Sequence, residues 1–146
     1  MCGIFGIVSN TKVPFNKGLF RALRIDNDLR GGDSCGIFID GKVENGIDDK
    51  KLFFDFYKTS ELFKNTRECY CAIGHDRKAS VGSVSLGAAQ PVIFRNDKGE
   101  IDFVVIHNGT IYNYLDLADK YIPTLDCSKM SDSQVMATIF YNAGYD

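Results

Sequence analysis

The sequence predicts an α+β fold. Apolar stretches of strand length are mixed with stretches of helical apolar spacing. They do not follow the regular strand–helix–strand rhythm of a doubly wound parallel sheet. Asp40-Gly41, between two apolar stretches, is a strong signal for a hairpin. The 146 residues suit one domain and show no repeat or linker.

The first part of the chain is predicted to form a strand, a helix and a hairpin. Glycine-spaced β-branched residues predict a buried strand at Gly3–Val8. Helical spacing with one apolar face predicts a helix over Phe15–Leu29, which Arg30-Gly31-Gly32-Asp33 ends. The hairpin strands are expected at Ser34–Ile39 and Lys42–Val43, followed by a loop at Asn45–Lys50.

The rest of the chain is predicted to form shorter elements. Thr59 or Ser60 would cap a short helix at Glu61–Lys64. Ser131 and Gln134 have the spacing of a capping box, so a helix is expected over Val135–Tyr141 and is closed by Gly144. The other expected elements are strands at Leu52–Tyr57, Glu68–His75 and Ile101–Ile106, and a helix at Tyr114–Tyr121.

Composition excludes several classes of protein. Apolar residues make up 45% and charged residues 25%, which is ordinary for a globular protein and unlike a disordered chain or coiled coil. The net charge of −2 gives no support for nucleic-acid binding. No apolar window is long enough for a membrane span, and the apolar start lacks the basic leader of a signal peptide. Five cysteines, an odd number, favour reduced thiols and a cytoplasmic location.

Cys2 is the candidate nucleophile because it directly follows Met1. Removal of Met1 would leave a thiol and a free α-amino group on one residue. Such groups ordinarily titrate within about a unit of each other, so the amine can take the thiol proton. One residue would then supply both nucleophile and general base. The plainer alternative is a small apolar residue that opens a strand.

A thiolate that attacks an amide creates an oxyanion, which needs hydrogen-bond donors. Asn108 and the Gly109 N–H, at the end of an apolar strand, are candidates for that role. Arg77 ends another strand and would bind a carboxylate, while Asp132 begins a capped helix and would bind an amino group. Each residue also has an ordinary alternative: a turn, a solvated arginine or a carboxylate that complements a helix dipole.

Several motifs occur together in one order along the chain. They resemble the glutaminase domain of class II glutamine amidotransferases, which are N-terminal-nucleophile hydrolases. The resemblance extends from residue 2 to about residue 138. The motifs are Cys2-Gly3-Ile4-Phe5-Gly6-Ile7, Arg30-Gly31-Gly32-Asp33-Ser34-Cys35-Gly36, Gly74-His75-Asp76-Arg77-Lys78-Ala79-Ser80-Val81-Gly82, Ala89-Gln90-Pro91, His107-Asn108-Gly109-Thr110-Ile111-Tyr112-Asn113 and Ser131-Asp132-Ser133-Gln134.

The resemblance implies a four-layer αββα sandwich of two antiparallel sheets. Cys2 would attack the side-chain amide of L-glutamine, release ammonia through a γ-glutamyl thioester and yield glutamate after hydrolysis. Asn108 and Gly109 would hold the oxyanion. The residues that would bind or shape the substrate pocket are Arg77 for the α-carboxylate, Asp132 for the α-amino group, backbone at Ser80 and Val81, and the pair Arg30 and Asp33. No metal or organic cofactor is implied.

The sequence also departs from the family pattern. Lys78 stands where the phosphosugar-aminating branch usually has tryptophan, and Ser80-Val81 replaces a Thr-His pair. Ala89-Gln90-Pro91 is more similar to the phosphoribosyl-aminating branch, so the ammonia acceptor stays open. Residues 1–146 are expected to be one glutaminase domain that is incomplete at its C-terminus, because the strands expected after the last helix are missing. A partner chain would then cover an exposed sheet edge.

Three functional hypotheses follow. The first is an active glutaminase that supplies ammonia to a synthase, isomerase or transferase partner. The second is a catalytically silent relative that binds glutamine or a partner in a regulatory role. The third is a zinc site of Cys69, Cys71, His75 and His107. Strand residues two apart are separated by roughly 6.6 Å along the chain, which disfavours the zinc site.

Overall fold

The computed structural model describes residues 2–28, 33–47, 60–78 and 88–144. These residues form an α+β fold with a four-stranded antiparallel sheet of order β1-β4-β2-β3 and a two-stranded antiparallel sheet, β5-β6. The elements are β1 (Gly3–Pro14), α1 (Lys17–Asp28), β2 (Ser34–Ile39), β3 (Lys42–Ile47), α3 (Glu61–Asn65), β4 (Glu68–Arg77), β5 (Val92–Arg95), β6 (Ile101–Val105), α4 (Tyr114–Tyr121) and α5 (Asp132–Ala143).

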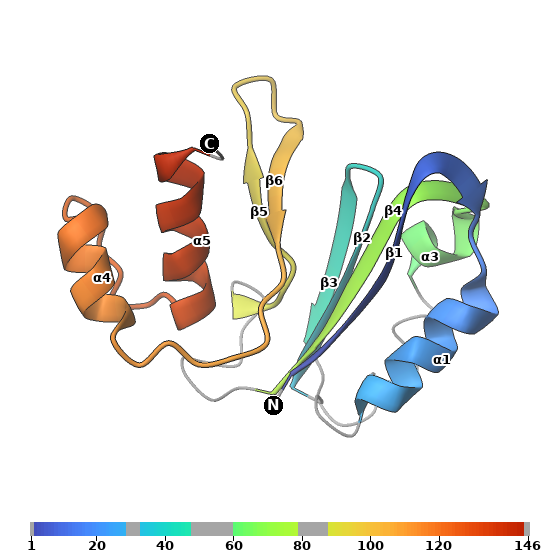
Figure 1. Cartoon of the computed structure of the whole chain (residues 1–146), viewed down its shortest axis with the longest axis horizontal. Helices are drawn as coiled ribbons and strands as arrows, with labels where there is room; N and C mark the ends of the chain where they lie inside the picture. The colour runs from blue at the N-terminus through green and yellow to red at the C-terminus, as the bar shows by residue number, and fades with distance from the viewer. Residues whose placement is uncertain (1, 29–32, 48–59, 79–87, 145–146) are drawn as a thin grey trace.

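The helices lie on the outer sides of the two sheets. In Figure 1, α1 and α3 lie beyond one side of the four-stranded sheet. Hairpin β5–β6 lies on its other side, with α4 and α5 beyond the hairpin. Helix α1 contacts β1, and α5 contacts both β5 and α4. The start of β1 pairs with the end of β4, and the segment that follows β6 contacts both, which is where the candidate site is found.

The larger apolar core fills the space between α1, α3 and the four-stranded sheet. Phe20 is fully buried there, and its ring centroid is 5.1 Å from that of Phe5. Gly74 lies opposite both Phe5 and Ile37, and a Cβ atom at Gly74 would come within 2.4 Å of the Phe5 ring. Glycine at this position therefore lets the aromatic cluster rest on the sheet. The buried members of this core are Phe5, Phe15, Phe20, Ile37, Ile39, Phe63, Cys69 and Ala72.

A smaller core holds α4 against α5. Its buried residues are Ala118, Ile122, Cys127 and Val135. Tyr141 on α5 stacks on Phe94 of β5 with ring centroids 4.5 Å apart, which ties the helix to the hairpin. The C-terminal part of α5 is thereby held against hairpin β5–β6.

The face of the four-stranded sheet that points away from α1 is polar near the C-terminal end of β4. Directly opposite residues of an antiparallel pair project to the same face. His75 pairs with both Ile4 and Gly36, and Arg77 pairs with Ser34, so these side chains share one face. The core residues Phe5 and Ile37 alternate with them and project to the α1 side. A buried polar surface therefore faces the second sheet.

Most of the predicted elements are confirmed. The hairpin turn is present, with positive φ at Asp40 and Gly41. The capping box of Ser131 and Gln134 is complete, and Ser60 caps α3 by accepting from the Phe63 N–H. The helix predicted over Tyr114–Tyr121 has those bounds in the structure.

Other predictions are wrong or fall outside the described residues. Asn45 to Ile47 was expected to be loop but continues β3, because these residues pair with β2. The sequence patterns missed β5 altogether, and β1 extends past Val8 to Pro14. The strand predicted at Leu52–Tyr57 and the glycines after Arg30 lie outside the described residues. No helix in the described ranges is long and apolar enough to cross a membrane.

Candidate active site

Cys2 and Asn108 meet where the N-terminal strand ends beside the segment that follows β6. The Cys2 backbone nitrogen donates to Asn108 Oδ1 at 3.2 Å. The register of β1 with β4 places Gly3 opposite Asp76, so Cys2 continues it on the face that carries His75 and Arg77. Cys2 is largely buried, with 9% of its surface exposed, whereas Asn108 is exposed. The nucleophile candidate and one oxyanion-donor candidate are therefore in direct contact.

The Cys2 thiol lies against the end of β4. The Lys78 backbone N–H donates to Cys2 Sγ at 3.4 Å, and the Sγ–H group faces the Lys78 carbonyl oxygen at 3.6 Å. A backbone N–H directed at sulfur stabilises negative charge that develops there. The Lys78 ammonium itself turns to Asp33, with Nζ 3.5 Å from Oδ1. Asp33 was expected to lie beside Arg30, but Arg30 is outside the described residues. Within the described residues, Asp33 forms an ion pair with Lys78.

Asn108 and Gly109 are positioned by the residue before them. The His107 backbone N–H donates to Gln90 Oε1 at 2.6 Å, and His107 Nδ1 lies 2.9 Å from Ser133 Oγ. Gln90 also donates from Nε2 to Ser133 Oγ at 3.2 Å. A Cβ atom at Gly109 would lie 2.8 Å from His107 Nε2, so the ring packs directly on Gly109. The loop after β6 is therefore held by buried groups from two other segments.

His75 holds the same loop from the four-stranded sheet. Its Nε2 lies 3.1 Å from the His107 carbonyl oxygen, which only accepts, so His75 carries its proton on Nε2. The side chain is fully buried. Burial lowers the pKa of His75 to about 4, and the positive charge of Arg77 adds to this, while the hydrogen bond to His107 acts in the opposite direction. His75 is accordingly a neutral donor at physiological pH.

Asp132 lies at the other end of this network. It occupies the first turn of α5, is buried, and accepts from the Ile111 N–H through Oδ2 at 2.9 Å. Ser133 lies 3.5 Å from Asp132 Oδ1 through its own hydroxyl. Asp132 therefore contacts Ile111 directly and reaches His107 through Ser133. These two residues lie on either side of Asn108 and Gly109 in the sequence. Arg77 is also buried, and its backbone carbonyl accepts from the Asp33 N–H at 2.8 Å.

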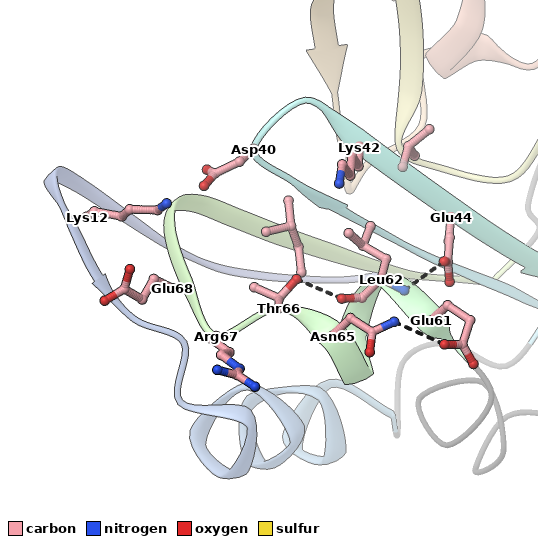
Figure 2. A pocket seen from close by; sticks show the side chains of 12 residues that line it. Lys12, Asp40, Lys42, Glu44, Glu61, Leu62, Asn65, Thr66, Arg67 and Glu68 are labelled. Carbon is pink, nitrogen blue, oxygen red and sulfur yellow. Dashed lines mark hydrogen bonds between the residues drawn. The ribbon is translucent and has the colours of Figure 1, made fainter.

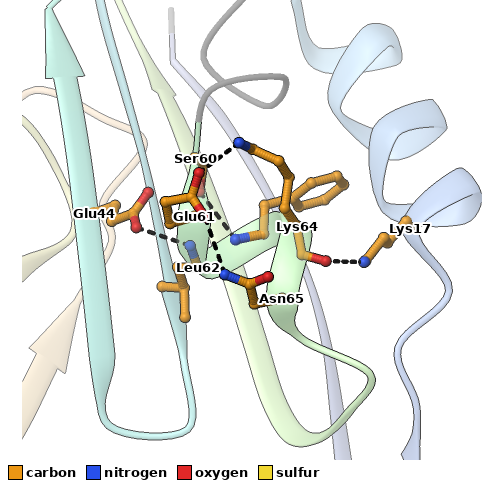
Figure 3. Close-up of polar contacts among 8 residues, drawn as sticks. Lys17, Glu44, Ser60, Glu61, Leu62, Lys64 and Asn65 are labelled. Atoms are coloured by element: carbon orange, nitrogen blue, oxygen red, sulfur yellow. Dashed lines mark hydrogen bonds and ion pairs between the residues drawn. The ribbon is translucent and has the colours of Figure 1, made fainter.

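A cavity of about 680 Å³ lies elsewhere, near the turn of hairpin β2–β3 and α3 (Figure 2). Its walls carry charged side chains of both signs, among them Lys42 and Glu44. Helix α3 is fastened there by Glu44 Oε1, which accepts from the Leu62 N–H at 2.9 Å, and by Lys17, which donates to the Lys64 carbonyl (Figure 3). None of the candidate catalytic residues lines this cavity, so the site does not lie there.

The structure thus brings Cys2, Asn108 and Gly109 together and links them to Asp132. The predicted residues Arg30, Ser80 and Val81 lie outside the described residues. The zinc hypothesis gains no support, because no group of three or more potential ligands in the described segments is placed to hold a metal ion. The sequence patterns did not assign a positioning role to the groups that hold the site together, which are His75, Gln90, His107 and Ser133. The two histidines were considered only as zinc ligands.

Comparison with known proteins gives one consistent result. A protein family described as "Glutamine amidotransferase domain" matches residues 60–146. Glutamine–fructose-6-phosphate aminotransferase (isomerizing) of Streptococcus agalactiae is 31% identical over 140 residues, covering 92% of this chain and 21% of the relative. Glutamine–fructose-6-phosphate aminotransferase (isomerizing) 2 of Bos taurus is 37% identical over 135 residues, covering 80% of this chain and 19% of the relative.

A relative with a different enzyme name matches nearly the whole of this chain. Amidophosphoribosyltransferase of Haemophilus influenzae is 30% identical over 147 residues, covering 97% of this chain and 27% of the relative. The chain therefore spans only about a fifth to a quarter of the length of these relatives.

Proposed function

Because the chain belongs to the class II glutamine amidotransferase family, we propose that it releases ammonia from L-glutamine with Cys2 as the nucleophile. The observation that carries the proposal is the hydrogen bond between the Cys2 nitrogen and Asn108 Oδ1 at 3.2 Å. It joins the group that would act as base to the side chain that would stabilise the oxyanion. Both groups are needed within a few ångströms of one scissile amide.

The first half of the reaction forms a thioester. After Met1 is removed, the α-amino group of Cys2 takes the thiol proton, and the thiolate attacks the side-chain amide carbon of glutamine. The resulting oxyanion accepts from Asn108 Nδ2 and the Gly109 N–H. The carbon–nitrogen bond then breaks, the α-ammonium group returns its proton to the leaving nitrogen, and ammonia departs.

The second half of the reaction consumes water. The α-amino group takes a proton from water, the hydroxide attacks the thioester carbon, and the same donors hold the second oxyanion. The carbon–sulfur bond breaks, glutamate leaves, and the thiolate of Cys2 is reprotonated. No metal or cofactor has a part in these steps.

The remaining candidate residues bind and shape the substrate in this proposal. Asp132 pairs with the α-amino group of glutamine and Arg77 with its α-carboxylate, since both charges are buried near the end of β4 and the start of α5. The backbone at Ser80 and Val81 completes the pocket. Arg30 and Asp33 would shape the pocket floor, and the contact of Asp33 with Lys78 supports a place for Asp33 close to Cys2.

Fold, acceptor and location belong to the same proposal. The order of helices and sheets in Figure 1 supports a four-layer αββα sandwich. The ammonia is transferred to an acceptor held by a synthase, isomerase or transferase partner domain or chain. Two of the relatives are named for fructose 6-phosphate and phosphoribosyl groups. Five free thiols support a cytoplasmic location.

The test is glutamate release from L-glutamine by protein whose intact mass shows that Met1 has been removed. Cys2→Ala is expected to abolish the activity and keep the fold, whereas Cys71→Ala, which removes another free thiol, keeps both. Hydrolysis that survives Cys2→Ala would overturn the proposal. A folded, Met1-free protein that binds glutamine in calorimetry without hydrolysing it would support the silent relative instead.

A further inference from the structure

Both histidines of the chain belong to one buried hydrogen-bond network behind Asn108 and Gly109. The sequence contains only two histidines, His75 and His107. His75 comes from the four-stranded sheet and His107 from the segment after β6. Their contact at 3.1 Å crosses between the two sheets. Neither residue has a role in the reaction steps described above.

The network fixes the peptide plane that precedes Asn108. His75 donates to the His107 carbonyl oxygen, and this carbonyl shares a peptide bond with the Asn108 nitrogen. The His107 N–H donates to Gln90 Oε1 at 2.6 Å. Both backbone polar groups of His107 are therefore held by side chains of buried residues, each 3% exposed or less. Rotation of this segment would leave buried polar groups without hydrogen bonds, which is costly.

The His107 ring extends the same restraint to Gly109 and to α5. Nδ1 of the ring lies 2.9 Å from Ser133 Oγ, and its Nε2 edge packs where a Cβ atom of residue 109 would be. Ser133 directly follows Asp132, and its hydroxyl also accepts from Gln90. One connected set of hydrogen bonds thus joins the two oxyanion-donor candidates to the residue proposed to bind the substrate amino group.

We propose that His75 and His107 are positioning residues, which hold Asn108 and Gly109 in the geometry that the oxyanion requires without touching the substrate themselves. This inference rests on the proposed glutaminase function. Donors must lie within hydrogen-bond distance of the developing oxyanion, and a displacement of about 1 Å can lower a rate by about 100-fold. Interactions made only in the transition state change kcat and leave KM nearly unchanged.

The decisive pair of variants is His75→Met and His75→Gln in the full chain. Glutamine keeps an N–H donor near the position of imidazole Nε2, whereas methionine has a similar length and no donor. We expect His75→Met to lower kcat by about 100-fold with KM within about threefold of wild type. His75→Gln is expected to recover most of that loss. If His75 had a purely structural role, the two variants would have the same kcat once each rate is corrected for the fraction of folded protein.

A second readout separates positioning from damage to the nucleophile. Alkylation of Cys2 by iodoacetamide, followed by mass spectrometry, uses the thiolate and forms no oxyanion. Its rate is expected to stay within about twofold of wild type in His75→Met. Ser133→Ala, which only removes a hydroxyl, tests the network in case a variant of the fully buried His75 does not fold; we expect about a tenfold loss in kcat.

The possible outcomes are distinct. Wild-type kcat in folded His75→Met, or in Ser133→Ala if His75→Met does not fold, would overturn the inference while the glutaminase function stands. Equal losses in His75→Met and His75→Gln, with slower alkylation, would also overturn it in favour of a structural role. A wild-type chain that lacks Cys2-dependent hydrolysis would overturn the proposed function and this inference with it.

Discussion

Cys2 and Asn108 are 106 positions apart in the sequence, yet the backbone nitrogen of one donates to the side-chain oxygen of the other. Because Oδ1 of Asn108 is turned toward Cys2, its Nδ2 group, in the same amide plane, points away from the Cys2 nitrogen. In the proposed mechanism, that leaves the NH₂ group for the substrate oxygen. The same contact orients the future α-amino group, which lies on the residue whose thiol it would deprotonate.

Asn108→Asp is expected to lower kcat for glutamine hydrolysis by about 10²–10³-fold. The substitution keeps the size of the side chain but replaces the donor with a carboxylate that repels the oxyanion. KM should change little, because the lost interaction forms only in the transition state. Initial-rate measurements of glutamate release check this prediction.

Asn113→Asp is the matched control for Asn108→Asp. Asn113 is also exposed, lies in the same motif, and makes no side-chain capping bond to α4. Wild-type kcat is expected for this control. Equal losses in both variants would show that added charge, and not the loss of a donor, is responsible.

Asp132→Asn is expected to raise KM for glutamine by about 10–100-fold and to leave kcat within a few-fold of wild type. The variant removes the charge proposed to bind the α-amino group, while an amide oxygen can still accept from the Ile111 N–H. Asp116→Asn removes a first-turn carboxylate from α4 and serves as the control for helix-dipole effects. An unchanged KM in Asp132→Asn would assign the amino group to another residue.

How far the fold could be predicted depends on whether the determining contacts are local. The Ser131–Gln134 capping box and the Asp40-Gly41 turn were predicted correctly because their determinants lie within a few residues. Asn45 and Gly46 have poor strand propensity, so a loop was expected, but pairing with Gly36 and Cys35 makes them part of β3. Such pairing is not visible in a local window.

The same limit applies to the candidate site. Cys2, Asn108 and Asp132 could be proposed because each belongs to a short motif with its own chemistry. In the sequence, Gln90 and Ser133 stand out only as members of the motifs Ala89-Gln90-Pro91 and Ser131-Asp132-Ser133-Gln134. Their role depends on bonds that span 17 and 26 positions to His107, and only the folded chain brings those atoms together.

Stability is expected to fall as the pH drops through the range set by His75. Its pKa is about 4 in the folded chain and 6.5 ordinarily, so the unfolded chain binds a proton that the folded chain excludes. The stability that neutral His75 contributes to folding is fully present above pH 6.5. It is lost progressively as the pH falls toward 4, by about 3 kcal/mol of unfolding free energy in total. Urea unfolding at a series of pH values measures this slope.

His75→Gln is expected to flatten that dependence, since glutamine does not titrate. If wild type and His75→Gln lose stability in parallel between pH 6.5 and pH 4, other groups cause the acid sensitivity.

Phe20→Ala is expected to cost about 3–5 kcal/mol of unfolding free energy. The Phe20 ring is fully buried and contacts Phe5, Phe15 and Phe63, so its loss opens a cavity beneath the sheet. Leu19→Ala, at the neighbouring position, where 49% of the residue is exposed, should cost about 0.5 kcal/mol or less. Denaturant unfolding compares the two, and equal costs would contradict the placement of α1.

Gly36→Ala is expected to impair both stability and catalysis, because Gly36 is where the Gln90 segment rests on the four-stranded sheet. A Cβ atom there would lie 2.2 Å from the Gln90 carbonyl oxygen and 2.9 Å from Pro91 Cδ, so the Gln90 backbone must move. That movement would withdraw Gln90 Oε1 from the His107 N–H. We expect a loss of about 1–3 kcal/mol in stability and of about 10–100-fold in kcat.

The control for Gly36→Ala is Gly18→Ala in α1. A Cβ atom at Gly18 would be no closer than 3.4 Å to its neighbours, and alanine is favoured over glycine by about 0.5–1 kcal/mol within a helix. Gly18→Ala should therefore be neutral or stabilising and fully active. If Gly36→Ala lost stability but kept wild-type kcat, the Gln90 segment would not transmit the displacement to His107, and its hydrogen bond would be structural only. Because Gln90 packs against Gly36 of β2, we expect Gly36→Ala to lose both stability and kcat, and Gly18→Ala to lose neither.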